Sequence, residues 1–245
     1  MSGHSKWNNI AKRKGANDAK KAAIFTKIGR KMAVAIKEGG SNNPDNNAKL
    51  RDCIAEAKAN NVPNDNIKRM LDKGNQSNVS YESNTYEGYG PSGIAVICET
   101  LTDNRNRTVA DVRHYFDKYG AGLGNAGCVS WQFEQKGVLI IERGDLDEDE
   151  TMMTVLDAGA DDFQADEDCF QIYTAPEDFS AVRDALTEAG FEFAQAEIQM
   201  VPQNTITLES QEDMAQLRKL LDSLEDNDDV QHVWHNWENE DDYEG

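Results

Sequence analysis

The sequence predicts an α+β fold, in which an N-terminal three-helix domain is followed by two βαββαβ domains, one inserted in the other. The apolar residues follow a helical period as far as Gly74, and segments with strand and helix patterns alternate beyond it. A chain of 245 residues with 38% hydrophobic content also suits several small cores better than one. The expected parts are a basic helical domain (residues 1–78), a split domain (79–136 with 203–238), an inserted domain (137–202) and an acidic tail (239–245).

The first domain is predicted to contain three helices. Between residues 17 and 37 an apolar side chain recurs at every fourth position, from Ile24 to Ile36, and Gly39 and Gly40 then end the helix. A second helix is expected from the turn at Pro44 to the break at Asn60–Pro63. A third, short helix follows and ends near Gly74. Short connections between three helices predict a small bundle.

Strand and helix patterns alternate in the rest of the chain. Residues 93–101 form a buried-strand pattern, 108–118 a helix with Thr108 and Asp111 in capping-box positions, and 129–133 an alternating strand. Residues 86–93 are expected to form a turn-rich aromatic loop. A complete βαββαβ unit follows, with strands 138–142, 162–165, 169–174 and 192–201 and helices 148–158 and 176–189. Strand 205–208, helix 211–224 and strand 230–236 form half of another such unit, as do the elements of residues 93–133. These two halves are expected to pair into one ferredoxin-like domain that carries the complete unit as an insertion.

The charge of the chain is strongly segregated. Residues 1–75 carry 16 Lys and Arg against 7 Asp and Glu, whereas the remaining residues carry 9 against 38. Most of the molecule would therefore repel a polyanion, and the basic end is set apart electrostatically. This end is the candidate nucleic-acid surface.

The lack of a recognisable targeting signal and the spacing of the cysteines favour a cytoplasmic protein. No stretch approaches the roughly 18 apolar residues of a membrane span, and the first residues lack the apolar run of a signal peptide. The four cysteines lie far apart without a C-x-x-C pair, which suits reduced core thiols better than disulfides or a zinc site. We expect no membrane partner.

Two groups of basic residues are candidates for contact with phosphates. On a helical wheel Lys20, Lys27, Arg30 and Lys31 flank the apolar stripe, where they could neutralise phosphates, and Trp7 could stack on a base. An ordinary solvated helix surface is the alternative. The island at residues 103–108 leads into a helix N-terminus, which favours anions, although capping by Asn104 or Thr108 with local ion pairs explains it equally well. The candidate residues are Lys6, Trp7, Lys12, Arg13, Lys14, Lys20, Lys21, Lys27, Arg30, Lys31, Arg105, Arg107 and Arg113.

Other motifs are better explained as structural. Residues 122–127 fit G-x-G-x-x-G but follow a helix and precede a strand, the reverse of the dinucleotide-binding context. The acidic runs at 147–150, 161–162 and 226–229 are typical of solvated loops and helix starts rather than of a metal site. His232 and His235 would lie on opposite faces of a strand. We therefore expect no catalytic residues, metal, cofactor or small-molecule substrate, and a metal-dependent nuclease is a distant alternative.

Several motifs together resemble one known family. They are Gly3–Trp7, Ile24–Lys27, Lys58–Pro63 with Asn66–Ile67, Tyr86–Pro91, Leu101–Val109, Leu224–Asp226 and Asp229–Gln231. Over nearly the whole chain they look like the YebC/PmpR family, whose mitochondrial relatives include the translational activator of cytochrome c oxidase. The resemblance implies the three-domain fold above and a role as a DNA-binding transcriptional regulator or as a ribosome-associated translation factor. The sequence does not decide between promoter DNA and ribosomal RNA as the partner. A monomer is favoured slightly as the oligomeric state.

Overall fold

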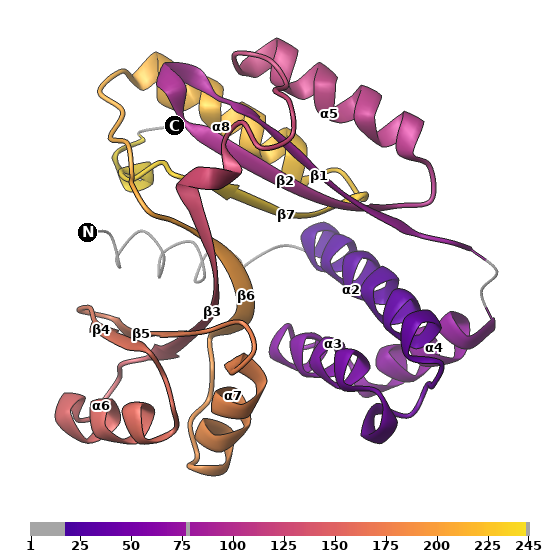
Figure 1. Cartoon of the computed structure of the whole chain (residues 1–245), viewed down its shortest axis with the longest axis vertical. Coiled ribbons are helices and arrows are strands. Elements are labelled where there is room, and N and C mark those ends of the chain that lie inside the picture. Colours follow the sequence, from indigo (N-terminus) through magenta and orange to yellow (C-terminus); the bar gives the residue numbers. More distant parts are fainter. Residues whose placement is uncertain (1–17, 77–78, 244–245) are drawn as a thin grey trace. The chain divides into compact units, whose positions relative to one another are not determined.

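The structure, a computed structural model, describes residues 18–76 and 79–243, with the side chains of 18–20, 75 and 76 left aside. The described chain separates into two compact units, one of residues 134–201 and the other of the segments on either side of them. Figure 1 shows the elements of each unit. Among the described residues, no helix is both long enough and apolar enough to cross a membrane. The predicted α+β class is confirmed.

The N-terminal helices form the predicted bundle. They are α2 (Asp18–Gly39), α3 (Ala48–Ala59) and α4 (Asn64–Gln76), and α2 packs against both of the others. The apolar stripe of α2 is buried against Leu50 of α3 and Ile67 of α4, as the helical period predicts. Asn47 fixes the turn between α2 and α3, because its side chain caps α3 through Leu50 N and also donates to Ala35 O of α2 at 2.7 Å.

The same unit contains a three-stranded antiparallel sheet in the order β1-β2-β7, built from β1 (Glu82–Tyr89), β2 (Ala95–Thr102) and β7 (Val230–His235). Helices α5 (Arg105–Tyr119) and α8 (Gln211–Glu225) cover one face of this sheet (Figure 1). Phe116 of α5, Leu217 of α8 and Cys98 of β2 are fully buried between the layers. Strands from before and after the inserted unit therefore share one sheet and one core.

Three details of this sheet differ from the sequence prediction. Residues 82–89 form a strand where a turn-rich loop was expected at 86–93, because β1 is an edge strand whose largely polar side chains show no apolar alternation. The expected strand 129–133 is instead a short 3-10 turn, Ser130–Gln132, that leads into β3. The expected strand 205–208 is reduced to one isolated bridge between Ile206 and Trp237.

The unit of residues 134–201 has the predicted ferredoxin-like order. Its strands β3 (Phe133–Glu142), β4 (Asp162–Ala165), β5 (Cys169–Thr174) and β6 (Gln195–Pro202) form a sheet in the order β4-β5-β3-β6. Helices α6 (Glu148–Asp157) and α7 (Phe179–Glu188) lie over this sheet, and Val155 and Leu186 are buried against Leu139 and Phe170. Each predicted element of the insertion is found within three residues of its expected bounds, apart from β3, which begins five residues earlier.

The glycine-rich segment 122–127 is a loop organised by Glu87 of β1. The Glu87 carboxylate is buried and accepts hydrogen bonds from the backbone N–H groups of Gly127, Val129 and Ser130 at 2.8–2.9 Å. Burial raises the pKa of Glu87, but these three hydrogen bonds outweigh it and hold the pKa below its ordinary value. Gly122 and Gly127 have backbone φ angles of +98° and +84°, which residues other than glycine rarely adopt. The loop therefore encloses an anion of the protein itself.

Replacing Glu87 by Gln should destabilise the fold, because one side-chain oxygen becomes an NH₂ group that faces backbone donors. The expected loss in the free energy of unfolding is about 1–3 kcal/mol at neutral pH. Because the Glu87 pKa is lowered in the folded state, this stabilisation is present above about pH 4.5 and is lost as the pH falls through the lowered pKa. Urea unfolding at neutral pH measures it. The matched change E82Q, at an exposed position of the same strand, should leave stability unchanged; equal stability of E87Q and E82Q would contradict this account.

Candidate nucleic-acid interface

Arg30 lies on the face of α2 that meets the three-stranded sheet β1-β2-β7, called here the split sheet because its strands come from both sides of the insertion. Its Nη1 atom lies 2.7 Å from Asp229 Oδ1 and 2.7 Å from the backbone oxygen of Asp228. The backbone oxygen of Leu101 is also within reach at 3.3 Å. The Arg30 side chain is 17% exposed and its partner Asp229 only 4%. Arg30 is therefore a structural contact between the helical bundle and the ends of β2 and β7.

Lys27 and Lys31 flank Arg30 and make contacts of the same kind. Lys27 Nζ donates to the backbone oxygen of Glu225, the last residue of α8, at 2.6 Å. A cation is favoured there because the carbonyl groups at a helix C-terminus carry partial negative charge. Lys31 Nζ lies 2.8 Å from Glu56 Oε1 of α3 and 2.9 Å from His232 Nε2 of β7. The middle of the basic helix is thus engaged with oxygen and nitrogen acceptors of the same unit.

Asp229, immediately before β7, is the carboxylate that Arg30 shares with α5. In addition to Arg30, its carboxylate receives hydrogen bonds from Arg107 Nη2 at 2.7 Å and from the Thr108 hydroxyl at 2.8 Å. Its backbone oxygen accepts from Leu101 N at 2.8 Å. Burial raises the pKa of Asp229, but the hydrogen bonds from Arg107, Thr108 and Arg30 together hold it below the ordinary value. The folded protein therefore keeps this buried carboxylate ionised.

The basic island at residues 103–108 surrounds the same carboxylate. Helix α5 begins at Arg105 and is capped by Asn104, whose side chain accepts from Arg107 N, so the expected helix start at Thr108 is three residues late. Asp229 and then Asp103 raise the pKa of the Arg107 guanidinium through hydrogen bonds. An anion lies at this helix start, where an anion is favoured. It is the carboxylate of Asp229, which the side chains of Arg107 and Thr108 hold.

The remaining candidate residues are distributed differently. Lys21 of α2 and both Arg105 and Arg113 of α5 are exposed, and Arg107 is about half exposed. Lys20 belongs to α2, but its side chain is outside the described atoms. The structure does not bring Arg113 into the cluster around Asp229. Five further candidates, Lys6, Trp7, Lys12, Arg13 and Lys14, lie outside the described residues. A nucleic-acid role of all these residues stays a prediction.

Sequence reasoning did not single out Asp229, Glu225 or His232 as partners of α2. The run 226–229 has the sequence of a solvated acidic loop, and three of its members are indeed exposed or half-exposed. Asp229 is buried because it precedes a strand, where its carboxylate reaches both α5 and α2. The sequence signal for this burial is that Asp229 directly precedes Val230, the buried first residue of the strand.

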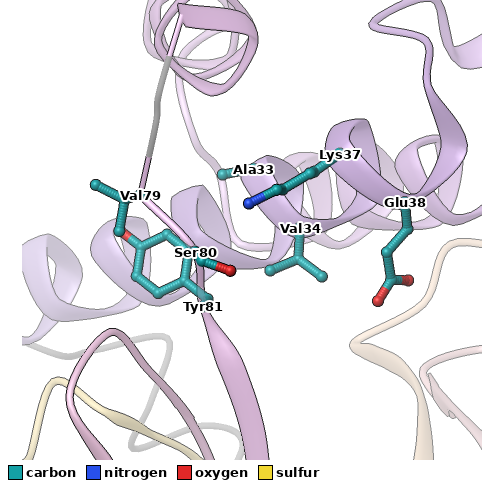
Figure 2. Close-up of a pocket in the computed structure, with 7 residues that line it drawn as sticks. All are labelled: Ala33, Val34, Lys37, Glu38, Val79, Ser80 and Tyr81. Atoms are coloured by element: carbon teal, nitrogen blue, oxygen red, sulfur yellow. The ribbon is translucent and has the colours of Figure 1, made fainter.

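A small pocket opens beside α2 at the chain that leads into β1. It has a volume of about 250 Å³ and is lined by Ala33, Val34, Lys37, Glu38 and residues 79–81. Figure 2 shows the Lys37 side chain extending along the pocket, whereas Glu38 points away from it. Its volume is below the roughly 300 Å³ at which small-molecule sites usually begin. No group of three His, Cys, Asp or Glu side chains within 18–76 and 79–243 is placed to hold a metal ion.

Replacing Asp229 by Asn should loosen the contact between α2 and the split sheet, because Arg30 and Arg107 would lose their shared anion. We expect a loss of about 2–4 kcal/mol in the free energy of unfolding at neutral pH. The Asp229 pKa is lowered in the folded state, so its stabilisation is present above the ordinary pKa of 3.8 and is lost as the pH falls through the lowered value. The difference between parent and D229N should therefore shrink below about pH 4, as measured by urea unfolding across pH.

Asp228 provides the matched control, since it is exposed and contacts Arg30 only through its backbone oxygen. D228N should unfold like the parent. A D229N protein as stable as D228N at neutral pH would show that the buried carboxylate does not hold these elements together.

Comparison with known proteins identifies the family of this chain. Residues 5–77 match the model described as the TACO1/YebC protein N-terminal domain, and residues 81–237 match the TACO1/YebC second and third domain. A protein of Clostridium tetani is 56% identical over 93% of both chains, and one of Ruminiclostridium cellulolyticum is 53% identical over 92% of both. Both are named probable transcriptional regulatory protein.

A solved structure is also similar. The crystal structure of a conserved hypothetical protein from Aquifex aeolicus matches with a TM-score of 0.80 and 39% identity, covering 90% of this chain and 91% of that one. Sequence and fold agree over nearly the whole length. The chain belongs to the TACO1/YebC family.

Proposed function

We propose that this chain is a cytoplasmic, non-enzymatic regulator of gene expression that binds DNA. The observation that carries the proposal is the charge distribution, with 16 Lys and Arg against 7 Asp and Glu in residues 1–75 of a chain whose net charge is −20. Clustered Lys and Arg bind a polyanion by neutralising phosphates and releasing their counterions. The relatives' name, probable transcriptional regulatory protein, supports the regulatory role.

The contacts of α2 divide the basic residues into two groups. Lys27, Arg30 and Lys31 already meet carbonyl, carboxylate and imidazole groups of the same unit, so contact with DNA phosphates would require exchanging those partners. We assign the phosphate contacts to the basic residues that precede α2 in sequence, namely Lys6, Lys12, Arg13 and Lys14. Lys20 and the exposed Lys21, at the start of α2, continue this basic run along the chain. Trp7 would stack on a base.

A second contact region is proposed on α5. Arg105 and Arg113 are exposed, and about half of the Arg107 surface stays accessible beside its ion pair with Asp229. Arg107 would then position the region, while Arg105 and Arg113 would meet phosphates. Backbone contacts of this kind give affinity and salt dependence without reading base sequence.

Neutralising the basic segment before α2 should weaken DNA binding and flatten its salt dependence. For K12Q/R13Q/K14Q, the slope of log K against log salt on duplex DNA should become shallower by about 2–3 units, at roughly 0.9 per lost phosphate contact. R105Q/R113Q should reduce the slope by about 1–2 units. Fluorescence anisotropy of a labelled duplex across a salt series measures both changes.

K68Q/R69Q is the matched control, because both side chains are exposed on α4 and the loss of positive charge is similar. It should change the slope little. If K12Q/R13Q/K14Q and R105Q/R113Q both bind duplex DNA like the parent at every salt concentration, the assigned surface does not bind DNA. Should the slopes change on ribosomal RNA but not on duplex DNA, the chain acts on the ribosome rather than as a DNA-binding regulator.

A further inference from the structure

Helix α6 exposes an unusual amount of apolar side-chain surface. Seven large apolar side chains are exposed among the described residues, and four of them lie between residues 146 and 156. They are Leu146, Met152, Met153 and Leu156, with exposed fractions of 41%, 37%, 64% and 47%. Single exposed apolar residues are normal on a protein surface, whereas a contiguous group is typical of a binding site.

The helical period places three of these residues on one face. Met152 and Leu156 are four residues apart, and Met153 and Leu156 are three apart, so their side chains are neighbours. Thr151 and Val155 lie on the opposite face, where they are buried against the sheet of this unit. The core of the unit therefore does not need the outer residues, and they form an apolar stripe along the helix, called here the α6 stripe (Met152, Met153 and Leu156).

The α6 stripe lies in a strongly acidic part of the sequence, although Arg143 pairs with Glu148 at the start of α6. Between Arg143 and Arg183 the chain has 13 Asp and Glu and no Lys, Arg or His. Asp149, Glu150 and Asp157 lie on α6 itself and are exposed. Such a surface repels nucleic acids and anionic lipid, and it attracts a cationic chain.

We propose that the α6 stripe binds a basic amphipathic segment of a partner protein. The apolar side of such a segment would cover Met152, Met153 and Leu156, and its Lys or Arg side chains would meet the acidic rim. Methionine suits this role because its flexible, polarisable side chain adapts to differently shaped apolar surfaces. None of the residues of the α6 stripe is among those assigned to DNA, so one chain would bind a nucleic acid and a basic protein through different residues.

A peptide with a defined pattern tests the proposal directly. The probe is a fluorescent peptide of about 18 residues, five helical turns, with Leu and Lys placed so that a helix is apolar on one face and basic on the other. The control peptide has the same composition in scrambled order. The full-length parent should bind the patterned peptide at least roughly tenfold more tightly than the scrambled one, because only the patterned peptide can cover the stripe.

Three variants of the full chain separate the apolar and charged contributions. M152Q/M153Q/L156Q should bind the patterned peptide about tenfold more weakly, since it loses the apolar contact. D149N/E150Q/D157N should bind more weakly and with a shallower salt dependence. I198Q changes an exposed apolar residue elsewhere in the same unit and should bind like the parent.

Each opposite result overturns the proposal. Equal binding of the patterned and scrambled peptides would show attraction by charge alone, and unchanged binding by M152Q/M153Q/L156Q would exclude the stripe. Tighter binding of the peptide to K12Q/R13Q/K14Q than to both the parent and the charge control K68Q/R69Q would mean that the basic segment of this chain competes for the stripe, so that no partner protein is needed.

Discussion

The buried carboxylate of Asp229 is the interaction on which the arrangement of the larger unit depends. An ionised group that is 4% exposed is stable only if neighbouring donors replace the water that it has lost. Arg30 of α2, Arg107 and Thr108 of α5 and the end of β2 supply these donors or pack around them. Satisfying one charge therefore brings α2 and the neighbouring elements β2 and α5 to the start of β7, more than 100 residues further along the chain than any of them.

The same principle explains two motifs that are otherwise signs of an external anion. The N-terminus of α5 with Arg107 and the glycine-rich loop at 122–127 both have the backbone donors that phosphates use. In this chain the Arg107 and Thr108 side chains at the first motif donate to Asp229, and backbone N–H groups at the end of the second donate to Glu87. Both carboxylates have lowered pKa values. These donors stabilise the fold, so the phosphate contacts of a nucleic-acid binder must come from other basic residues.

The sequence was sufficient for the elements that have strong periodicity. The helical stripe of Ile28, Met32 and Ile36 and the strand-helix alternation of residues 138–201 both correspond to buried faces, which is why their bounds agree with the structure. Strand β1 was missed because an edge strand with polar side chains lacks that pattern. The start of α5 was misplaced because both Asn104 and Thr108 can cap a helix, and only the structure shows that Asn104 does so.

The candidate site was less predictable than the fold. A helical wheel shows that Lys27, Arg30 and Lys31 share a face of α2, but it cannot show which element that face meets. Their partners lie about 200 residues further along the chain, at Glu225, Asp229 and His232. Such long-range pairs leave no local pattern, so the same basic face was equally compatible with phosphates and with the acceptors that the structure reveals.

A double-mutant cycle between Arg30 and Asp229 tests the central claim most directly. The free energy of unfolding is measured for the parent, R30Q, D229N and R30Q/D229N at neutral pH and low salt. If the pair holds α2 to the split sheet, the two single variants should each lose stability. The sum of their losses in unfolding free energy should exceed the loss of the double variant by about 1–3 kcal/mol. Additive losses, with a coupling energy near zero, would contradict the claim that this buried charge joins the two parts of the fold.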